Sequence, residues 1–494
     1  MRLSELMNGE GGIATIAPPG DPEIRGLSLD SRRVEPGFVF AALPGTKTDG
    51  KRFVDDAVAR GAVVILTDDP KSYDALTRRA PPVTIVGDPN PRRRIARMAA
   101  RFYHPQPETV AAVTGTNGKT SVTVFTRQLW QGLGQPAASL GTIGIVAPGF
   151  SRPGSLTTPD PVTLHSELNA LAQSGIDHVA IEASSHGLDQ FRLDGLKPKA
   201  AAFTNLTRDH LDYHHDMAAY RAAKARLFTD LLPKDGVAVL NLDDETGADL
   251  ARDCAARGQR VIGYGRSERA ALRLIAARPT AVGQELTADL LGERQTISLP
   301  LIGEFQAMNV LAALGLGLAT GADLGAAVAL LPSLAGAPGR MERVGTHPSG
   351  APILVDYAHT PDALENALKA LRSHVKGRII VVFGAGGDRD AGKRPQMGAV
   401  AKLLADVAIV TDDNPRSEEP AAIRHTILEA CPGAIEIGDR ADAIRRGLAM
   451  LRTGDALLLA GKGHETGQIV AGKTLPFSDT DVARAALTEL GSAA

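Results

Sequence analysis

The sequence reads Val110-Ala-Ala-Val-Thr-Gly-Thr-Asn-Gly-Lys-Thr-Ser121 at the point that decides its fold class. An aliphatic run enters a turn with two glycines, and apolar residues then follow at helical spacing, so a strand, a loop and a helix are predicted. Such a turn aims backbone N–H groups and a helix N-terminus at phosphate oxygens. Lys119 would then reach the β- and γ-phosphates of a nucleotide, and the Thr120 hydroxyl would hold Mg²⁺.

This turn departs from the strict phosphate-loop pattern GxxxxGK(S/T), because Val113 stands at the first glycine position. A structural turn without a ligand is the alternative interpretation. A Lys-Thr pair beside two glycines at a strand-to-helix junction favours nucleotide binding. The predicted phosphate contacts are Gly115, Thr116, Asn117, Gly118, Lys119, Thr120 and Ser121.

Short aliphatic runs alternate with helical patterns along most of the chain, which is typical of parallel α/β architecture. Examples of such runs are residues 63–66, 109–113, 178–181, 237–240, 378–383 and 456–459. Two proline-containing segments, His104-Pro-Gln-Pro107 and Gly336-Ala-Pro-Gly-Arg340, interrupt the pattern. They predict three α/β domains, at residues 1–105, 106–337 and 338–494.

Composition excludes several classes of protein. The 494 residues include 54 Lys+Arg and 56 Asp+Glu, a formal charge of -2, so bulk charge favours neither a nucleic-acid nor a membrane partner. Cys254 and Cys431 are far apart and lack metal-ligand spacing, so neither a disulfide framework nor a zinc site is predicted. The residues from Met1 to Gly9 lack the continuous apolar stretch expected of a secretory signal, and no run approaches the roughly 18 apolar residues expected of a membrane span. We expect a cytoplasmic protein.

An acid and an imidazole follow two of the aliphatic runs. Glu182 closes the run at 178–181, and His210 ends a polar segment that follows another run at 200–203. Ligands of open α/β sheets lie beyond the carboxyl ends of the strands, so Glu182, His210 and Thr120 form a candidate cation site. For Glu182 or His210 alone, a helix-capping acid or a hydrogen-bonded histidine is about equally expected.

Lys224 lies within an apolar helical stripe made of Met217, Tyr220, Leu227, Phe228 and Leu231. Burial would lower the pKa of this amine and leave it neutral and nucleophilic. The helical spacing alone favours the alternative, a lysine that extends to the rim of the stripe.

Charged clusters follow three runs near the C-terminus. Phe383-Gly-Ala-Gly-Gly-Asp-Arg-Asp390 fails the GxGxxG dinucleotide pattern, because Arg389 stands where the third glycine is needed for close packing. Asp412-Asp-Asn-Pro-Arg416 and Ala460-Gly-Lys-Gly-His-Glu465 present arginine and carboxylates together. Such groups suit a zwitterionic amino acid, and surface salt bridges are an equally expected alternative.

Together these motifs closely resemble the Mur ligases of peptidoglycan synthesis, and among them the ligases that add 2,6-diaminopimelate. The resemblance rests on Thr114-Gly-Thr-Asn-Gly-Lys-Thr120, Glu182-Ala-Ser-Ser-His-Gly-Leu188, Thr204-Asn-Leu-Thr-Arg-Asp-His-Leu-Asp-Tyr-His214, Pro338-Gly-Arg-Met-Glu342, Val355-Asp-Tyr-Ala-His-Thr-Pro361 and Asp413-Asn-Pro-Arg416. It spans all three predicted domains in order. It implies an N-terminal uridine-binding domain, a central P-loop-type ATPase domain with a parallel sheet, and a Rossmann-like C-terminal domain.

The resemblance also implies binding residues. Those for the UDP-MurNAc-dipeptide substrate are Leu29, Ser31, Thr46, Lys47, Thr48, Thr157, Thr158, Ser184, Gln190 and Arg192. Leu156 stands where some relatives have asparagine, so no contact is expected there. Asn309, Arg340 and Asp356 match further ATP-site positions. The diaminopimelate pocket is expected at Arg389, Asp413, Asn414, Pro415, Arg416, Gly461 and Glu465.

The same resemblance implies a reaction. ATP and Mg²⁺ would activate the D-glutamate carboxylate of UDP-MurNAc-L-Ala-D-Glu as an acyl phosphate, which the amine of meso-diaminopimelate then attacks. Lys224 matches a lysine that the family converts with CO₂ to a carbamate, so its functional interpretation gains over the structural one. As a carbamate it would join Thr120, Glu182 and His210 at the metal, and Lys119, Lys224, Glu182 and His210 are the expected catalytic groups.

Two other functions stay open at this stage. A folylpolyglutamate synthetase-like ligase would share the phosphate loop but lack the N-terminal uridine-binding domain. A P-loop regulatory NTPase belongs to a different class, and Val113 together with the absence of an Asn-Lys-x-Asp motif argues against it. ATP turnover that requires both an acyl acceptor and an amine would separate a ligase from these alternatives and from a purely structural protein.

Overall fold

The computed structural model describes residues 1–7, 15–16, 21–45, 49–78, 82–154, 156–280 and 283–492. They form two compact units. The first consists of Met1–Lys119, Trp130–Gly263 and Leu316–Ala322, and the second of Thr120–Leu129, Tyr264–Gly315 and Asp323–Ala494.

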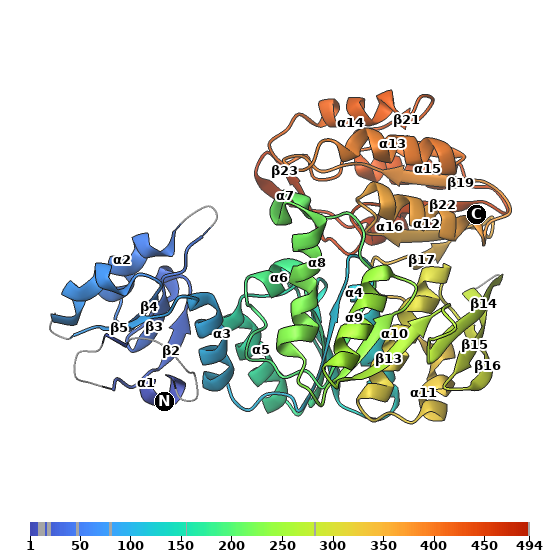
Figure 1. Ribbon diagram of the computed structural model, residues 1–494. Coiled ribbons are helices and arrows are strands. Elements are labelled where there is room, and N and C mark those ends of the chain that lie inside the picture. Colours follow the sequence, from blue (N-terminus) through green and yellow to red (C-terminus); the bar gives the residue numbers. More distant parts are fainter. Residues whose placement is uncertain are drawn as a thin grey trace. The chain divides into compact units, whose positions relative to one another are not determined.

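A five-stranded sheet of order β1-β5-β4-β3-β2 opens the first unit. Its strands are β1 (Thr15–Ile16), β2 (Gly26–Ser28), β3 (Phe38–Ala41), β4 (Ala62–Thr67) and β5 (Thr84–Gly87). Side chains alternate between the two faces of each strand. One face therefore packs on α1 (Leu3–Met7) and α3 (Pro91–Phe102), and the other packs on α2 (Val54–Ala59) (Figure 1).

The central sheet has eleven strands in the order β16-β15-β14-β13-β12-β11-β6-β10-β7-β8-β9. Its parallel strands around the phosphate loop are β7 (Ala137–Gly141), β10 (His178–Glu182), β6 (Thr109–Thr114), β11 (Ala200–Phe203) and β12 (Val237–Asn241). The others are β8 (Gly144–Ala147), β9 (Phe150–Arg152), β13 (Arg260–Gly265), β14 (Leu272–Thr280), β15 (Gly283–Leu290) and β16 (Glu293–Leu299). β8 pairs antiparallel with β7 and with β9, and β15 pairs antiparallel with β14 and with β16.

Helices of the central region lie between these strands in the chain or follow the last of them. They are α4 (Lys119–Gly132), α5 (Pro161–Gln173), α6 (Ser185–Asp189), α7 (Leu211–His214), α8 (Met217–Arg226), α9 (Glu245–Ala256), α10 (Glu304–Ala319) and α11 (Leu324–Leu330). A π-helical turn, η4 (Leu227–Leu231), continues α8. Leucines of α5, α9 and η4 pack on the strands β6, β10 and β12 in one apolar core.

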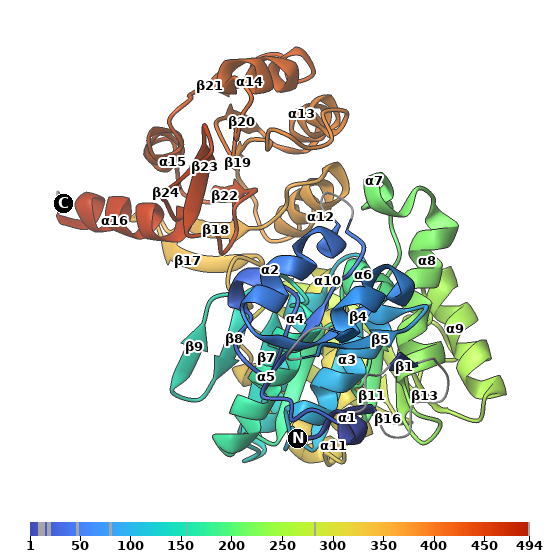
Figure 2. The same ribbon diagram turned by 90° about the vertical axis from the view of Figure 1, so that its left-hand side faces the viewer.

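The C-terminal sheet lies in the second unit and has the order β17-β18-β22-β19-β20-β21. Its strands are β17 (Glu342–Thr346), β18 (Pro352–Asp356), β22 (Ala456–Ala460), β19 (Ile379–Phe383), β20 (Val407–Val410) and β21 (Ile435–Glu436). One face packs on α12 (Pro361–Arg372), α13 (Lys393–Leu404) and α14 (Pro420–Glu429), and the other on α15 (Arg440–Ala449) and α16 (Asp479–Ser492) (Figure 2). A hairpin of β23 (Gly467–Val470) and β24 (Lys473–Pro476) follows β22.

Each aliphatic run that predicted a strand forms one, and the strands beside the phosphate loop are parallel, so the α/β fold class is confirmed. Parallel pairing explains why these runs are apolar on both faces: helices cover each side of the sheet. None of the helices in the described ranges is long and apolar enough to cross a membrane.

Candidate active site

The predicted phosphate loop begins where β6 ends, between two parallel neighbours. β6 pairs with β10 on one side and with β11 on the other. Glu182 at the end of β10 is in register with Val113, and Phe203 at the end of β11 is in register with Thr114. Three adjacent strands therefore end together at one edge of the sheet, which is where ligands of α/β proteins bind.

Hydrogen bonds to the segment after β11 hold this loop in shape. The backbone N–H of Thr116 donates to the Asn205 carbonyl oxygen at 2.8 Å, and that of Asn117 donates to Asn205 Oδ1 at 3.0 Å. The Thr204 hydroxyl donates to the Asn117 carbonyl oxygen at 2.6 Å. The segment 204–207 that the sequence singled out thus supports the phosphate loop directly. Thr120 and Ser121 follow it, buried in the first turn of α4.

Two lysines converge on one backbone oxygen of the loop. Lys119 Nζ donates to the carbonyl oxygens of Gly115 at 2.9 Å and of Thr116 at 2.7 Å. Lys224 Nζ donates to the same Gly115 oxygen at 2.8 Å. If both amines carry a proton, their like charges repel each other, and a phosphate would relieve that repulsion.

Lys224 is buried, with 1 % of the residue exposed, and its amine also lies 4.4 Å from the centre of the Tyr220 ring. Burial and the neighbouring Lys119 charge lower the pKa of Lys224 well below that of a free lysine. The alternative of a lysine extending to the rim is wrong. The apolar stripe itself needs one correction: Met217, the first residue of α8, is 37 % exposed, because packing does not reach that end of the helix.

Glu182 is buried and held by a threonine that the sequence did not single out. Thr142 donates its backbone N–H to Glu182 Oε1 at 2.8 Å and its hydroxyl to Oε2 at 3.1 Å, and it also hydrogen-bonds the Thr157 hydroxyl at 3.0 Å. Gly141 precedes Thr142, and a Cβ there would overlap the Glu182 carboxylate. The carboxylate therefore has a fixed orientation.

The residues expected around the muramoyl peptide form one hydrogen-bonded network. The Thr158 hydroxyl donates to the Glu182 carbonyl oxygen at 2.8 Å and accepts from the Ser184 backbone N–H at 3.0 Å. Arg192 donates to the Thr158 carbonyl oxygen at 2.7 Å and to Gln190 Oε1 at 2.7 Å. The structure thus brings these predicted residues together with Glu182, and Ser184 also caps α6.

His210 lies at the start of α7 in a left-handed conformation, with φ 54°. The centroid of its ring lies 4.9 Å from that of His186. His186 lies on α6, which follows Glu182 in the chain. In the described part of the chain, no group of three or more His, Cys, Asp and Glu side chains could hold a metal ion by itself.

In the N-terminal sheet, Leu29 and Ser31 follow β2, and Ser31 is buried. Thr46, Lys47 and Thr48, which the resemblance assigns to the same substrate, lie outside the described residues. The nearby helix α3 starts at Pro91 with its Asn90 cap accepting from the Arg93 backbone N–H at 3.0 Å.

In the second unit, the remaining predicted ATP-site residues are linked in a chain. Asn309 Nδ2 donates to Gln306 Oε1 at 3.0 Å, and Gln306 Nε2 donates to the Arg340 carbonyl oxygen at 3.3 Å. Asp356 accepts from the backbone N–H of Met341 at 2.7 Å. Burial raises the pKa of Asp356 to about 6, and the Arg340 charge opposes that rise.

The residues expected around diaminopimelate meet at the carboxyl ends of β19, β20 and β22. Asn414 Nδ2 donates to Glu465 Oε2 at 2.9 Å, and Arg416 Nη1 donates to the Gly387 carbonyl oxygen at 2.8 Å. Asp413 and Pro415 are buried, and Arg389 is exposed on the loop that contains Gly387. Gly461 has φ +117°, and a Cβ there would stand 2.6 Å from Asp413 Oδ2.

The sequence prediction missed Thr142, which orients Glu182, and Lys462, which donates to Asn414 and Glu465. Thr142 carries no pattern of its own, because its role comes only from the pairing of β7 with β10. Lys462 had a usable signal: like Lys119, it lies beside glycines just after an aliphatic strand.

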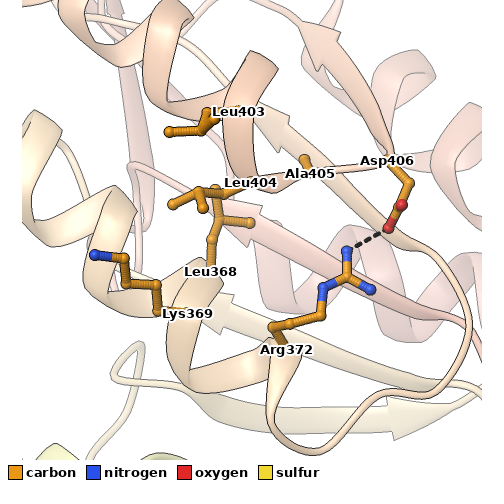
Figure 3. Close-up of a pocket in the computed structure, with 7 residues that line it drawn as sticks. All are labelled: Leu368, Lys369, Arg372, Leu403, Leu404, Ala405 and Asp406. Atoms are coloured by element: carbon orange, nitrogen blue, oxygen red, sulfur yellow. Dashed lines mark hydrogen bonds and ion pairs between the residues drawn. The ribbon is translucent and has the colours of Figure 1, made fainter.

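A cavity of about 290 Å³ lies away from these residues, between α12 and α13 (Figure 3). Its charged groups are already paired: Arg372 with Asp406, and Lys369 with Glu365. Exposed Leu403 stands at its edge. None of the predicted site residues lines this cavity.

Three models of known protein families match successive parts of the chain. The "Mur ligase family, catalytic domain" matches residues 23–103, the "Mur ligase middle domain" residues 113–317, and the "Mur ligase, glutamate ligase domain" residues 339–463.

Individual relatives match over the full length. The chain is 53 % identical over 491 residues to the UDP-N-acetylmuramoyl-L-alanyl-D-glutamate--2,6-diaminopimelate ligase of Bradyrhizobium diazoefficiens, covering 99 % of both proteins. A solved structure of a ligase with that same name covers 99 % of both chains at 34 % identity and a TM-score of 0.72. Folylpolyglutamate synthase of Mycobacterium tuberculosis shares the fold at 20 % identity, with a TM-score of 0.62 and 81 % of this chain covered against 95 % of its own. The chain therefore belongs to the Mur ligase family.

Proposed function

We propose that this chain is an ATP-dependent ligase that joins an amino group of meso-2,6-diaminopimelate to the D-glutamate carboxylate of UDP-MurNAc-L-Ala-D-Glu, in the synthesis of peptidoglycan precursors. The observation that carries the proposal is the match, over 99 % of both chains, to a relative named for this reaction. The similarity to folylpolyglutamate synthase supports only a shared fold. We also propose a cytoplasmic location and three domains at residues 1–105, 106–337 and 338–494.

The phosphate loop supports the first half of the reaction. Lys119, which now donates to loop carbonyl oxygens, can turn to the γ-phosphate and neutralise it while the carboxylate attacks the phosphorus. The P–O bond to ADP breaks as the acyl phosphate forms. Asn309, Arg340 and Asp356 would contact the nucleotide.

Glu182 fits a magnesium site. Mg²⁺ that binds with a nucleotide needs one or two carboxylates, phosphate oxygens and waters. Each Glu182 oxygen accepts one hydrogen bond from Thr142, so each retains a lone pair. Glu182, His210 and Thr120 would hold the ion, which neutralises charge on the phosphates when bound.

A carbamate on Lys224 also fits. The amine is buried, and its lowered pKa favours the neutral form that can attack CO₂, with loss of one proton. The charge of Lys119, which opposes an ammonium at this position, would attract the carbamate anion. The modified side chain would add hard oxygens beside those of Glu182.

The second half of the reaction needs a neutral amine, which attacks the acyl carbon and expels phosphate as the amide forms. Cationic groups such as Lys119 and Arg192 would stabilise the developing oxyanion. The diaminopimelate pocket is proposed at Arg389, Asp413, Asn414, Pro415, Arg416, Gly461 and Glu465, and the muramoyl site at Thr157, Thr158, Ser184, Gln190 and Arg192. Leu29, Ser31, Thr46, Lys47 and Thr48 would hold the uridine diphosphate.

The test is a ligase assay with UDP-MurNAc-L-Ala-D-Glu, ATP and a panel of amino acids, in which phosphate release and product mass are followed together. We expect phosphate release to require both the nucleotide substrate and diaminopimelate, with a product heavier by one diaminopimelate less water. Lys119→Ala serves as the negative control and should release no phosphate. ATP hydrolysis that proceeds without an amine, or a product with glutamate added instead, would contradict the proposal.

A further inference from the structure

A buried lysine that the reaction as described does not use lies beside Asn414 and Glu465, two of the residues expected around diaminopimelate. Lys462 follows β22 in the loop Gly461-Lys-Gly-His-Glu465, and its side chain is 0 % exposed. A buried ammonium is costly unless it is paired and hydrogen-bonded. Lys462 has two such partners: Nζ donates to Glu465 Oε2 at 3.0 Å and to Asn414 Oδ1 at 3.2 Å.

These bonds fix how the Asn414 amide faces. Its oxygen accepts from Lys462 and also from the backbone N–H of Ile469 at 2.9 Å. With two donors on Oδ1, the amide cannot be turned over without loss of both bonds. Asn414 Nδ2 must then point to Glu465 Oε2, at 2.9 Å. Lys462, Asn414 and Glu465 therefore form a closed triangle.

The triangle gives the two oxygens of the Glu465 carboxylate different hydrogen bonding. Oε2 accepts from both Lys462 and Asn414, whereas Oε1 has no hydrogen bond to any described residue. The Glu465 side chain is 30 % exposed, and Oε1 is not among the buried polar atoms that lack a partner, so Oε1 is accessible to a ligand. One oxygen thus anchors the side chain, and the other is free to accept from a ligand ammonium group.

Charge adds a second consequence. The Lys462–Glu465 pair is neutral as a whole, so an ammonium group that binds Oε1 gains less than it would beside an isolated carboxylate. An amine that carries its own carboxylate can regain that difference from a nearby guanidinium such as Arg416. This arrangement favours a zwitterionic ammonium–carboxylate centre over a simple amine.

We propose that Lys462 is a positioning residue of the amino-acid pocket, which holds Asn414 and Glu465 so that Glu465 Oε1 receives the ammonium group of the incoming zwitterion. The inference rests on the proposed function. Lys462 itself does not touch the substrate. It acts through the two side chains that it orients.

The decisive measurement is the KM of the full-length Lys462→Met variant for each of the three substrates. Methionine keeps most of the volume of lysine but removes the charge and all three donors. We expect the KM for diaminopimelate to rise by about tenfold or more, with the KM for ATP and for UDP-MurNAc-L-Ala-D-Glu almost unchanged. A rise in all three KM values together with a fall in kcat would indicate a general structural role and overturn the proposal. Lys402→Met, at an exposed position of α13, is the matched control and should behave like the unaltered enzyme.

A double-mutant cycle separates action through Asn414 from direct contact. Because Lys462 also holds Glu465, Lys462→Met should add to the loss in kcat/KM caused by Asn414→Ala, but by less than Lys462→Met costs on its own. Additive losses would overturn the proposal. Should Lys462→Met fail to fold, Lys462→Gln can replace it, because glutamine keeps a donor without the charge. The same cycle with Lys462→Gln distinguishes action through Asn414 from direct contact with the substrate. A wild-type enzyme that makes no diaminopimelate product would refute the proposed function itself, which is a different outcome from an unchanged KM.

Discussion

The carbonyl oxygen of Gly115 accepts from two ammonium groups, those of Lys119 and Lys224. Two like charges on one oxygen raise the free energy of the doubly protonated state. Lys224 is the more deeply buried of the two, and burial together with the Lys119 charge lowers its pKa. The phosphate loop is therefore contacted by a lysine of α8 whose lowered pKa favours the neutral amine.

From this follows the expectation that Lys224→Ala abolishes ligation and that a short carboxylic acid such as acetate partly restores it. The acid would occupy the vacated space and supply the oxygens of the proposed carbamate. The assay is product formation against acetate concentration, with ethylamine as the control that should not restore activity. Unmodified Lys224 in clear electron density of an active complex with metal and nucleotide would refute the carbamate.

Arg416 has a guanidinium that pairs with no carboxylate among the described residues; its Nη1 donates only to backbone oxygens of Gly387 and Asn414. The remaining donors suit the second carboxylate of diaminopimelate, which lysine lacks. We expect kcat/KM for diaminopimelate to exceed that for lysine by about 100-fold or more. Arg416→Ala should remove most of this preference, whereas Arg445→Ala on the exposed face of α15 should not. An unchanged preference in Arg416→Ala would exclude this role.

At the scale of elements, α5 carries a histidine that must stay neutral. His165 is buried; its Nδ1 lies 2.9 Å from the Gln106 amide nitrogen, which can only donate, and its Nε2 faces the Asp194 carbonyl oxygen at 3.3 Å. A second proton on the ring would place two donors against each other. Burial lowers the pKa of His165 to about 4, although the bond to Asp194 opposes the shift.

This pKa predicts acid sensitivity in a defined window. The pKa in the folded state lies below the value of about 6.5 in the unfolded chain, so the stabilisation is complete above pH 6.5 and is lost as the pH falls towards 4. Each pKa unit corresponds to about 1.4 kcal/mol, so the loss is about 3 kcal/mol. Thermal unfolding of the wild type and of His165→Asn between pH 4 and pH 7 checks this: the wild type should show the steeper fall. Parallel curves would show that His165 does not govern the acid limb.

The sequence predicts the individual strands and helices better than it predicts the side-chain contacts between them. The aliphatic runs identify strands such as β6 and β10, and the strand-end rule then identifies Lys119 and Glu182. Helical spacing placed Lys224 on a packed face but could not say how far packing extends, which is why Met217 was misjudged. The bonds of Lys462 to Asn414 join residues 48 positions apart, so they depend on which strands become neighbours. Local patterns contain no such information.

At the scale of the whole first unit, one carboxylate joins two regions. Asp194, with a side chain 2 % exposed, accepts from Arg93 of α3 at 2.9 Å and from Arg226 of α8 at 3.1 Å. Arg93 lies in the part matched by the N-terminal family domain, and Arg226 follows Lys224 by two residues. The helix that carries Lys224 is thus tied to the part that is expected to bind uridine diphosphate.

Asp194→Asn should destabilise the unit by about 3 kcal/mol, because two arginines lose a buried counter-charge. We also expect a raised KM for the uridine substrate and little change for diaminopimelate. Asp249→Asn is a matched control, since Asp249 likewise pairs with two arginines, Arg221 and Arg252, but is 25 % exposed; its loss should cost less than about 1 kcal/mol. Thermal unfolding of both variants provides the comparison, and equal shifts would contradict this assignment to Asp194.

The close approach of Gly141 to Glu182 limits how this gene can vary over generations. Any side chain at position 141 would displace the Glu182 carboxylate. Gly141 binds no ligand itself, but a substitution there would disturb a residue that is expected to hold metal. Gly317 of α10 has only an ordinary contact, 3.7 Å from a built Cβ to Ala322. In a library of random single substitutions selected for growth, alleles at position 141 should therefore disappear as fast as those at Glu182, while Gly317→Ala persists.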